Sequence, residues 1–191
     1  WSLPKYDNHC ELDFEAAAQD LQQTLEESVK LHLKSDVSVG MMLSGGVDSN
    51  TLATLTKQQI QNPITGVCGG GIGQATTDPD VSDFKFARDC AGTLGFNYSE
   101  VKIPANDYLE SWQSLVAHLE SPLATPTDAI IYQIAQRLKT TCGVALGGEG
   151  ADEAFCGYAV QHWSDLVFGA LTHLVTGFAF FKDLFTFGCQ I

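Results

Sequence analysis

The stretch "MLSGGVDSN", residues 42–50, decides how this chain is interpreted. It overlaps the end of an apolar run, "VSVGMML" (residues 37–43), which predicts a buried strand. The residues that follow, "NTLATLTKQQI" (50–60), carry leucines and an isoleucine at a spacing that favours one face of a helix. We therefore expect residues 44–49 to form a tight turn between a strand and a helix.

The residue types in this turn are typical of an anion site. Gly45 and Gly46 let the backbone approach a ligand closely, and Ser44 and Ser49 offer hydroxyl groups. The first turn of the following helix adds free N–H groups and the positive end of the helix dipole, which favour phosphate. Asp48 suits a Mg²⁺ ion that bridges phosphates. The alternative is a turn selected for its geometry and capping alone.

Predicted strands and helices alternate along the rest of the chain. This order predicts an α/β fold with a parallel sheet and helices on both faces, and ligands of such sheets bind beyond the carboxyl ends of the strands. Asp13 is expected to cap the first helix and Asn106 a later one, while the glycines 69–71 open a loop, "GGGIGQATT". The expected strands are residues 37–43, 64–69, 97–103 and 143–148, and the expected helices are 13–33, 50–60, 78–95, 106–120 and 129–141.

A second glycine-rich stretch, "GGEGADEAFCGY" (residues 147–158), follows the fourth predicted strand. It places Glu149, Asp152 and Glu153 within five residues, and carboxylates are the ligands that Mg²⁺ prefers. The alternative is a solvated acidic loop that caps a helix near Ala151. Both glycine-rich stretches should lie at the same edge of the sheet.

Composition narrows the class of partner and the compartment. The 191 residues carry 10 Lys and Arg against 23 Asp and Glu, a net charge of −13, which argues against nucleic acid as a partner. The six cysteines form no C-x-x-C pair, so we expect reduced thiols, no zinc site and a cytoplasmic protein. The apolar run 166–181 has 16 residues, short of the roughly 18 of a membrane span. We interpret it as a core helix, with membrane association as the alternative.

The two glycine-rich stretches together resemble the synthetase domain of the asparagine synthetase family, which has a PP-loop ATP pyrophosphatase fold. The matching patterns are S-G-G-V-D-S and G-E-G-x-D-E-x-F-x-G-Y, and "SDFKFARDCAGTLG" and "HLESPLATPTDAIIY" are similar to further family segments. The resemblance implies an adenine nucleotide α-hydrolase-like fold. It makes residues 1–12 a linker from a missing N-terminal glutaminase domain and residues 13–191 a synthetase domain that is incomplete at its C-terminus.

The resemblance also assigns roles to residues. Adenine and ribose would be held by backbone groups of Leu43, Val67, Cys68 and Gly69. Pyrophosphate and metal would be held by Ser44, Gly45, Gly46, Asp48 and Ser49. AMP would contact Gly147 and Gly148. Glu149 and Asp48 would be catalytic, and Asp152 would be a second ligand of Mg²⁺. Asp83, Glu120, Tyr132 and Asp152 would lie on the substrate side.

The implied activity is a carbon–nitrogen ligase of the glutamine-hydrolysing asparagine synthase type, which uses ATP and Mg²⁺. It would adenylate a small-molecule carboxylate, aspartate first among them, and ammonia from a glutaminase domain or subunit would then displace AMP. Gly147 stands where the family often has serine, which removes one hydroxyl near AMP. The segment "SPLATPTDAI" (121–130) is not a clear match for true asparagine synthetases, so amidation of a different carboxylate is a competing hypothesis. Two further hypotheses are a PP-loop enzyme of tRNA modification and a non-catalytic fragment. The sequence leaves the oligomeric state open.

Overall fold

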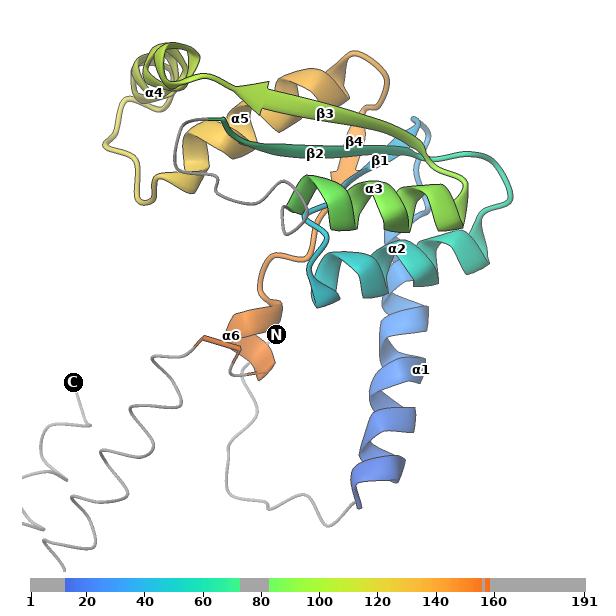
Figure 1. Cartoon of the computed structure of the whole chain (residues 1–191). Coiled ribbons are helices and arrows are strands. Elements are labelled where there is room, and N and C mark those ends of the chain that lie inside the picture. Colours follow the sequence, from blue (N-terminus) through green and yellow to red (C-terminus); the bar gives the residue numbers. More distant parts are fainter. Residues whose placement is uncertain (1–12, 73–82, 156, 159–191) are drawn as a thin grey trace, which may run out of the picture. The chain divides into compact units, whose positions relative to one another are not determined.

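A four-stranded parallel sheet is the centre of the structure, a computed structural model that describes residues 13–72, 83–155 and 157–158 (Figure 1). The strand order is β3-β2-β1-β4, so β1 lies between β2 and β4. Every pairing is parallel, which confirms the predicted α/β class. The strands are β1 (Val39–Met42), β2 (Thr65–Gly71), β3 (Asn97–Ile103) and β4 (Val144–Leu146).

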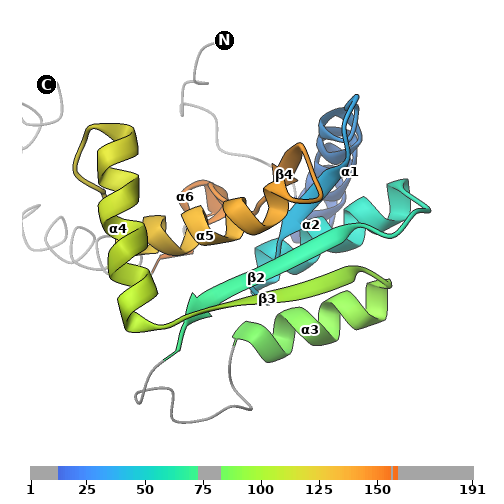
Figure 2. The ribbon, with the colours of Figure 1, turned by 90° about the horizontal axis from the view of Figure 1, so that it is seen from above.

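Helices cover both faces of this sheet, as the alternating pattern predicts (Figure 2). On one face, α2 (Val47–Gln59) and α3 (Asp83–Leu94) pack against each other, with α3 on β2 and α1 (Phe14–His32) against α2. On the other face, α5 (Thr127–Lys139) lies mainly over β2, and α4 (Ala105–Leu119) packs against α5. The chain divides into two compact units, Trp1–Gly148 and Glu149–Ile191, and the short α6 (Ala151–Phe155) belongs to the second.

The core consists of two apolar clusters, one on each face of the sheet. Beneath α2 and α3, Met41, Leu43 and Cys68 meet helix alanines that have no exposed surface, such as Ala87. The small alanine side chains let these helices lie close to the strands. On the other face, Val67 packs with side chains of α5. Because β1 and β2 are covered on both sides, neither strand contains a charged residue.

Two of the predicted helix boundaries are confirmed, whereas the starts of α2, α4 and α5 differ from the prediction; α5 begins at Thr127, two residues before the predicted 129. Asp13 caps α1 by accepting a hydrogen bond from the Ala16 N–H (2.8 Å), and α3 ends before Gly95, whose φ is +69°. α4 begins at Ala105 after Pro104 rather than after Asn106, because proline's fixed φ suits the entry to a helix. α2 begins at Val47, three residues before the predicted start.

The glycines 69–71 form no loop, which corrects another prediction. They continue β2, because the long strand β3 gives each of them a partner: Gly69 pairs with Val101 and Gly71 with Ile103. The first part of the predicted helix 78–95 lies outside the described residues. So do the predicted linker 1–12 and the apolar run 166–181.

In the described part of the chain, no helix is long and apolar enough to cross a bilayer. Cys68, Cys90 and Cys142 are free thiols.

Candidate functional site

The turn after β1 lies where the strand order reverses. From β1 the chain proceeds through α2 to the neighbour on one side, β2, whereas the neighbour on the other side is β4, which comes last. In open parallel sheets the loops on either side of such a reversal separate and leave a crevice at the carboxyl edge. Both predicted glycine-rich stretches therefore begin at this one position in the sheet.

Gly45 gives the turn a conformation that only glycine adopts easily. Its φ is +76°, in the left-handed region. A Cβ atom there would lie 2.6 Å from Phe86 Cβ and 2.9 Å from both the Ala87 backbone nitrogen and the Asp83 carbonyl oxygen. The turn is consequently seated directly on the first turn of α3, which also brings Asp83 beside it.

Side chains of the turn hold its shape from within. The hydroxyl oxygens of Ser44 and Ser49 are 3.0 Å apart, and the buried Ser49 hydroxyl donates to the Gly46 carbonyl (3.1 Å). The Gly46 N–H donates to Ser44 Oγ (3.3 Å), and the Asn50 amide donates to the Gly45 carbonyl (3.2 Å). The loop is therefore organised before any ligand arrives.

The N-terminus of α2 is open beside this network. Gly46 is its N-cap residue, and no side chain makes a capping hydrogen bond there. The first helical bond runs from the Asn50 N–H to the Gly46 carbonyl, so the N–H groups of the first turn have no partner within the helix. Val47 and Asp48 in this turn are exposed. An anion placed here would receive several N–H donors and the positive end of the helix dipole.

The end of β4 closes on the same turn. A Cβ atom at Gly148 would lie 3.1 Å from Asp48 Cβ and 3.3 Å from the Ser49 nitrogen, so the backbone approaches the start of α2 closely. Gly147 has more room, because the nearest atom to its Cβ position is Met42 Cβ at 4.0 Å. A Cβ atom at this position would displace no neighbour.

The end of β2 presents backbone groups to the crevice. The Leu43 N–H donates to the Val67 carbonyl (2.9 Å), and beyond this bond β1 has ended while β2 continues. Backbone groups in a parallel strand alternate sides, so those of Gly69 point to the same side as those of Val67. Ile134 of α5 packs on Gly69, where a Cβ atom would come within 2.5 Å of Ile134 Cγ1. This edge suits a flat ligand group recognised by main-chain atoms.

Cys68, in the same strand, has a perturbed thiol. Burial, with a smaller opposing contribution from hydrogen bonding to Tyr98, raises the pKa of Cys68 from 9.0 to about 11. Its side chain lies in the cluster under α3, facing away from α5, and only 1% of it is exposed. By the alternation described above, the backbone groups of Cys68 point toward β3, so the structure does not bring them to the crevice with those of Gly69.

The Cys68 thiol leads to a prediction for alkaline pH. The folded-state pKa is the higher one, so the contribution of the protonated thiol is complete below pH 9 and declines as the pH approaches 11. We expect the free energy of unfolding to fall by about 1–2 kcal/mol between pH 8 and pH 10.5. Urea denaturation at both pH values measures this fall, and Cys68→Ala should show a smaller one. An equal fall in the free energy of unfolding in the two proteins would show that the Cys68 thiol is not its cause.

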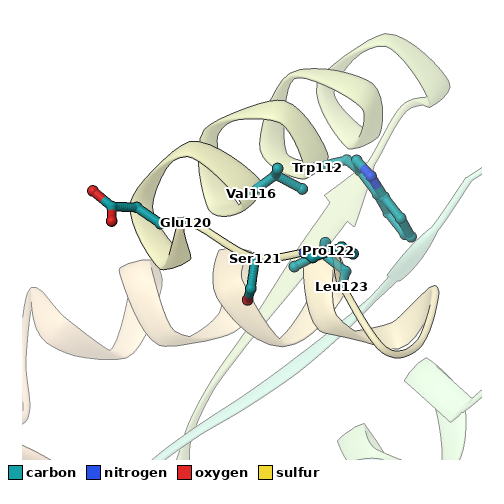
Figure 3. A pocket seen from close by; sticks show the side chains of 6 residues that line it. All are labelled: Trp112, Val116, Glu120, Ser121, Pro122 and Leu123. Atoms are coloured by element: carbon teal, nitrogen blue, oxygen red, sulfur yellow. The ribbon is translucent and has the colours of Figure 1, made fainter.

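Not all predicted residues gather at the turn. Glu120, with φ +53° at the end of α4, lines a groove of about 450 Å³ together with Trp112, Val116, Ser121, Pro122 and Leu123 (Figure 3). The residues lining this groove include none from the turn. Tyr132 lies on α5, half-buried. Glu149 and Asp152 belong to the second unit, where Gly150 (φ +93°) precedes α6 and Asp152 is in its first turn.

Two supporting features were not predicted. The first turn of α3 lies under Gly45, and the Asn50 side-chain amide donates a hydrogen bond to the Gly45 carbonyl. The asparagine directly after the S-G-G-V-D-S pattern was a usable signal, because asparagine side chains often bond to nearby backbone groups. The contact with α3 had no local signal, since it joins residues some 40 positions apart.

The geometry fits a phosphate group better than a dedicated metal cage. Open N–H groups, two hydroxyls and a left-handed glycine form a concave anion site. In the described part of the chain, no three His, Cys, Asp or Glu side chains converge as a metal site. Asp48 is exposed at the mouth of the turn, which suits a cation that takes its other ligands from phosphate and water.

A doubly covered parallel sheet with this loop after β1, at the strand reversal, is the architecture of the PP-loop ATP pyrophosphatases. A family model described as "Asparagine synthase" matches residues 20–176, and the chain belongs to this family. It is 32% identical over 142 residues to asparagine synthetase [glutamine-hydrolyzing] 1 of Bacillus subtilis, covering 74% of this chain and 22% of the relative. It is 31% identical over 152 residues to asparagine synthetase B of Escherichia coli, covering 75% and 27%.

The chain thus spans about a quarter of the length of these relatives. Among solved structures, the NH3-dependent NAD synthetase of Campylobacter jejuni is similar with a TM-score of 0.49 and 15% identity, over 74% of this chain and 60% of that one. The U34-tRNA thiolase NcsA of Methanococcus maripaludis is similar with a TM-score of 0.47 and 18% identity, over 76% and 48%.

Proposed function

We propose that this chain is the ATP-using part of a carbon–nitrogen ligase that converts a carboxylate into an amide. The observation that carries the proposal is the open N-terminus of α2 behind the left-handed Gly45, at the strand reversal. It supports a site for the phosphates of ATP, with adenine along the end of β2 near Leu43 and Gly69. The names of the curated relatives support amide formation as the reaction type.

In the first step a substrate carboxylate oxygen attacks the α-phosphorus of ATP. The bond from this phosphorus to the bridging oxygen breaks, and pyrophosphate leaves with that oxygen while an acyl-adenylate forms. The first-turn N–H groups of α2 and the Ser44 hydroxyl would stabilise the charge that grows on pyrophosphate. A bound Mg²⁺, held in part by Asp48, would neutralise the same charge. Gly148 would let AMP lie close to the turn.

In the second step the nitrogen of ammonia attacks the acyl carbon. The bond from that carbon to the AMP oxygen breaks, AMP leaves and the nitrogen loses a proton. We assign the support of this step to Glu149 and a second metal contact to Asp152. Ammonia would come from glutamine hydrolysis on another domain or subunit, as the glutamine-hydrolysing relatives suggest by name.

The substrate that we propose is the β-carboxylate of aspartate, which makes the product asparagine. The test is pyrophosphate release by the protein with MgATP, ammonium and a panel of carboxylates that includes aspartate. Release that depends on aspartate, with asparagine and AMP formed in equal amounts, is the expected result. Pyrophosphate release with another acid alone would support the ligase activity but show that aspartate is not the substrate. No release with any acid, from folded protein, would overturn the proposal.

A further inference from the structure

The first turn of α3 rests on two glycines from different parts of the site. The Phe84 ring covers Gly70 of β2, where a Cβ atom would lie 3.1 Å from Phe84 Cζ. Further along the same turn, Phe86 and Ala87 form the floor under Gly45. The position of α3 therefore determines how much room the turn 44–49, called here the phosphate-binding turn, has on one side.

Side chains of β3 hold this part of α3 in place. Tyr98, Glu100 and Lys102 alternate along the strand, so all three face α3. The Tyr98 hydroxyl donates to the Phe84 carbonyl (3.1 Å), and Lys102 Nζ lies 5.9 Å from the centre of the Phe84 ring. Glu100 accepts from Arg88 on α3 through Nε (3.0 Å) and again through Nη2, and pairs with Lys102 Nζ (3.1 Å).

Glu100 is the centre of this group. Only 15% of its side chain is exposed, whereas more than half of each cationic side chain is. Burial acts to raise its pKa, but hydrogen bonds from Arg88 and Lys102 outweigh burial, and the pKa of Glu100 is lowered. An exposed ion pair contributes little to stability, but a mostly buried carboxylate with two cationic partners contributes more.

We propose that Glu100 is a positioning residue for the phosphate-binding turn. Through Arg88 it holds α3 on β3, and α3 in turn supports Gly45 in its left-handed conformation. The effect on nucleotide affinity rests on the proposed function, whereas the effect on the turn itself does not.

The test compares Glu100→Gln with Glu27→Gln in the full chain without ligand. Glu27 is an exposed residue of α1, so the control makes the same chemical change away from the site. Amide hydrogen exchange in the peptide that spans residues 44–50, in which the N–H groups of Ser44, Gly46 and Asn50 are hydrogen-bonded, should become about fivefold faster in Glu100→Gln and stay unchanged in the control. Exchange in β1 and α5 should stay unchanged in both. Equal exchange in the two variants, or a uniform increase throughout Glu100→Gln, would overturn the proposal.

Arg88 provides a second variant, since more than half of its side chain is exposed and Arg88→Met should fold. It should accelerate exchange in the same peptide, and the double variant should add little because both changes break one interaction. With MgATP, Glu100→Gln should raise KM about fivefold with kcat nearly unchanged. A wild-type protein that binds no MgATP would refute the proposed function, while the exchange result would still decide this proposal.

Discussion

Gly45→Ala should reduce MgATP binding and pyrophosphate release by at least about 100-fold and lower the free energy of unfolding by about 1–3 kcal/mol. The added methyl group meets the Ala87 nitrogen and the Asp83 carbonyl oxygen at 2.9 Å. These are backbone atoms of a packed helix, so they cannot move aside as a flexible side chain would. The φ of +76° adds strain for alanine, and the turn should leave the geometry that directs its donors at phosphate.

Gly92→Ala is the matched control. Gly92 lies in α3, the helix that Gly45 contacts, and a Cβ atom at Gly92 would have nothing within 4 Å. Alanine is the better helix former by roughly 0.5–1 kcal/mol, so this variant should be slightly more stable with unchanged MgATP affinity. Calorimetric titration and thermal unfolding measure both properties. A Gly45→Ala protein that keeps wild-type affinity would show that the left-handed turn is not required.

Asp48→Asn should lower pyrophosphate release by about 100-fold while leaving stability within about 0.5 kcal/mol of wild type. The side chain is exposed, and among the described residues no hydrogen bond or ion pair holds its carboxylate, so its charge affects folding only through the dipole of α2, by a few tenths of a kcal/mol. Asparagine keeps the size of the side chain beside Gly148, and only the charge offered to Mg²⁺ is lost. Release should be measured over a range of Mg²⁺ concentrations, with the loss partly recovered at high Mg²⁺.

Asp36→Asn is the control for net charge, because Asp36 is exposed in the segment before β1, at the opposite end of that strand. It should release pyrophosphate like wild type at every Mg²⁺ concentration. Identical rates for Asp48→Asn and Asp36→Asn would remove the metal role from Asp48. The phosphate role of the turn would then rest on its serines and backbone amides.

The chain's local sequence was sufficient to predict most elements of the fold. Apolar runs and helical spacing identified the four strands and the helices around them, because a buried parallel strand and an amphipathic helix each carry their own period. Errors fell at element ends. The helix after the turn begins earlier than predicted, since Val47 and Asp48 have no apolar periodicity, and the glycines 69–71 were assigned to a loop because glycine is rare within strands.

The candidate site, like the fold, was predicted in part. The serines, glycines and aspartate of the turn were predicted together, because a strand, a glycine pair and a helix start occupy adjacent positions in the sequence. The left-handed φ of Gly45 was not predicted, and it is seen together with the contact between Gly45 and α3, which is a tertiary one. The placement of Gly148 against Asp48 could not be predicted as a contact, since it requires β4 to be the neighbour of β1.

By itself, then, the sequence determined a strand, a turn that suits phosphate, and a helix. It also determined the α/β class and the edge of the sheet at which a ligand is expected to bind. Only the tertiary structure decided that α3 lies under Gly45, that Glu100 holds α3, and that the end of β4 faces the turn. The physical reason is that periodicity and turn chemistry act between near neighbours in the chain. The order of strands in a sheet, by contrast, is set by packing across the whole domain, between residues far apart in sequence.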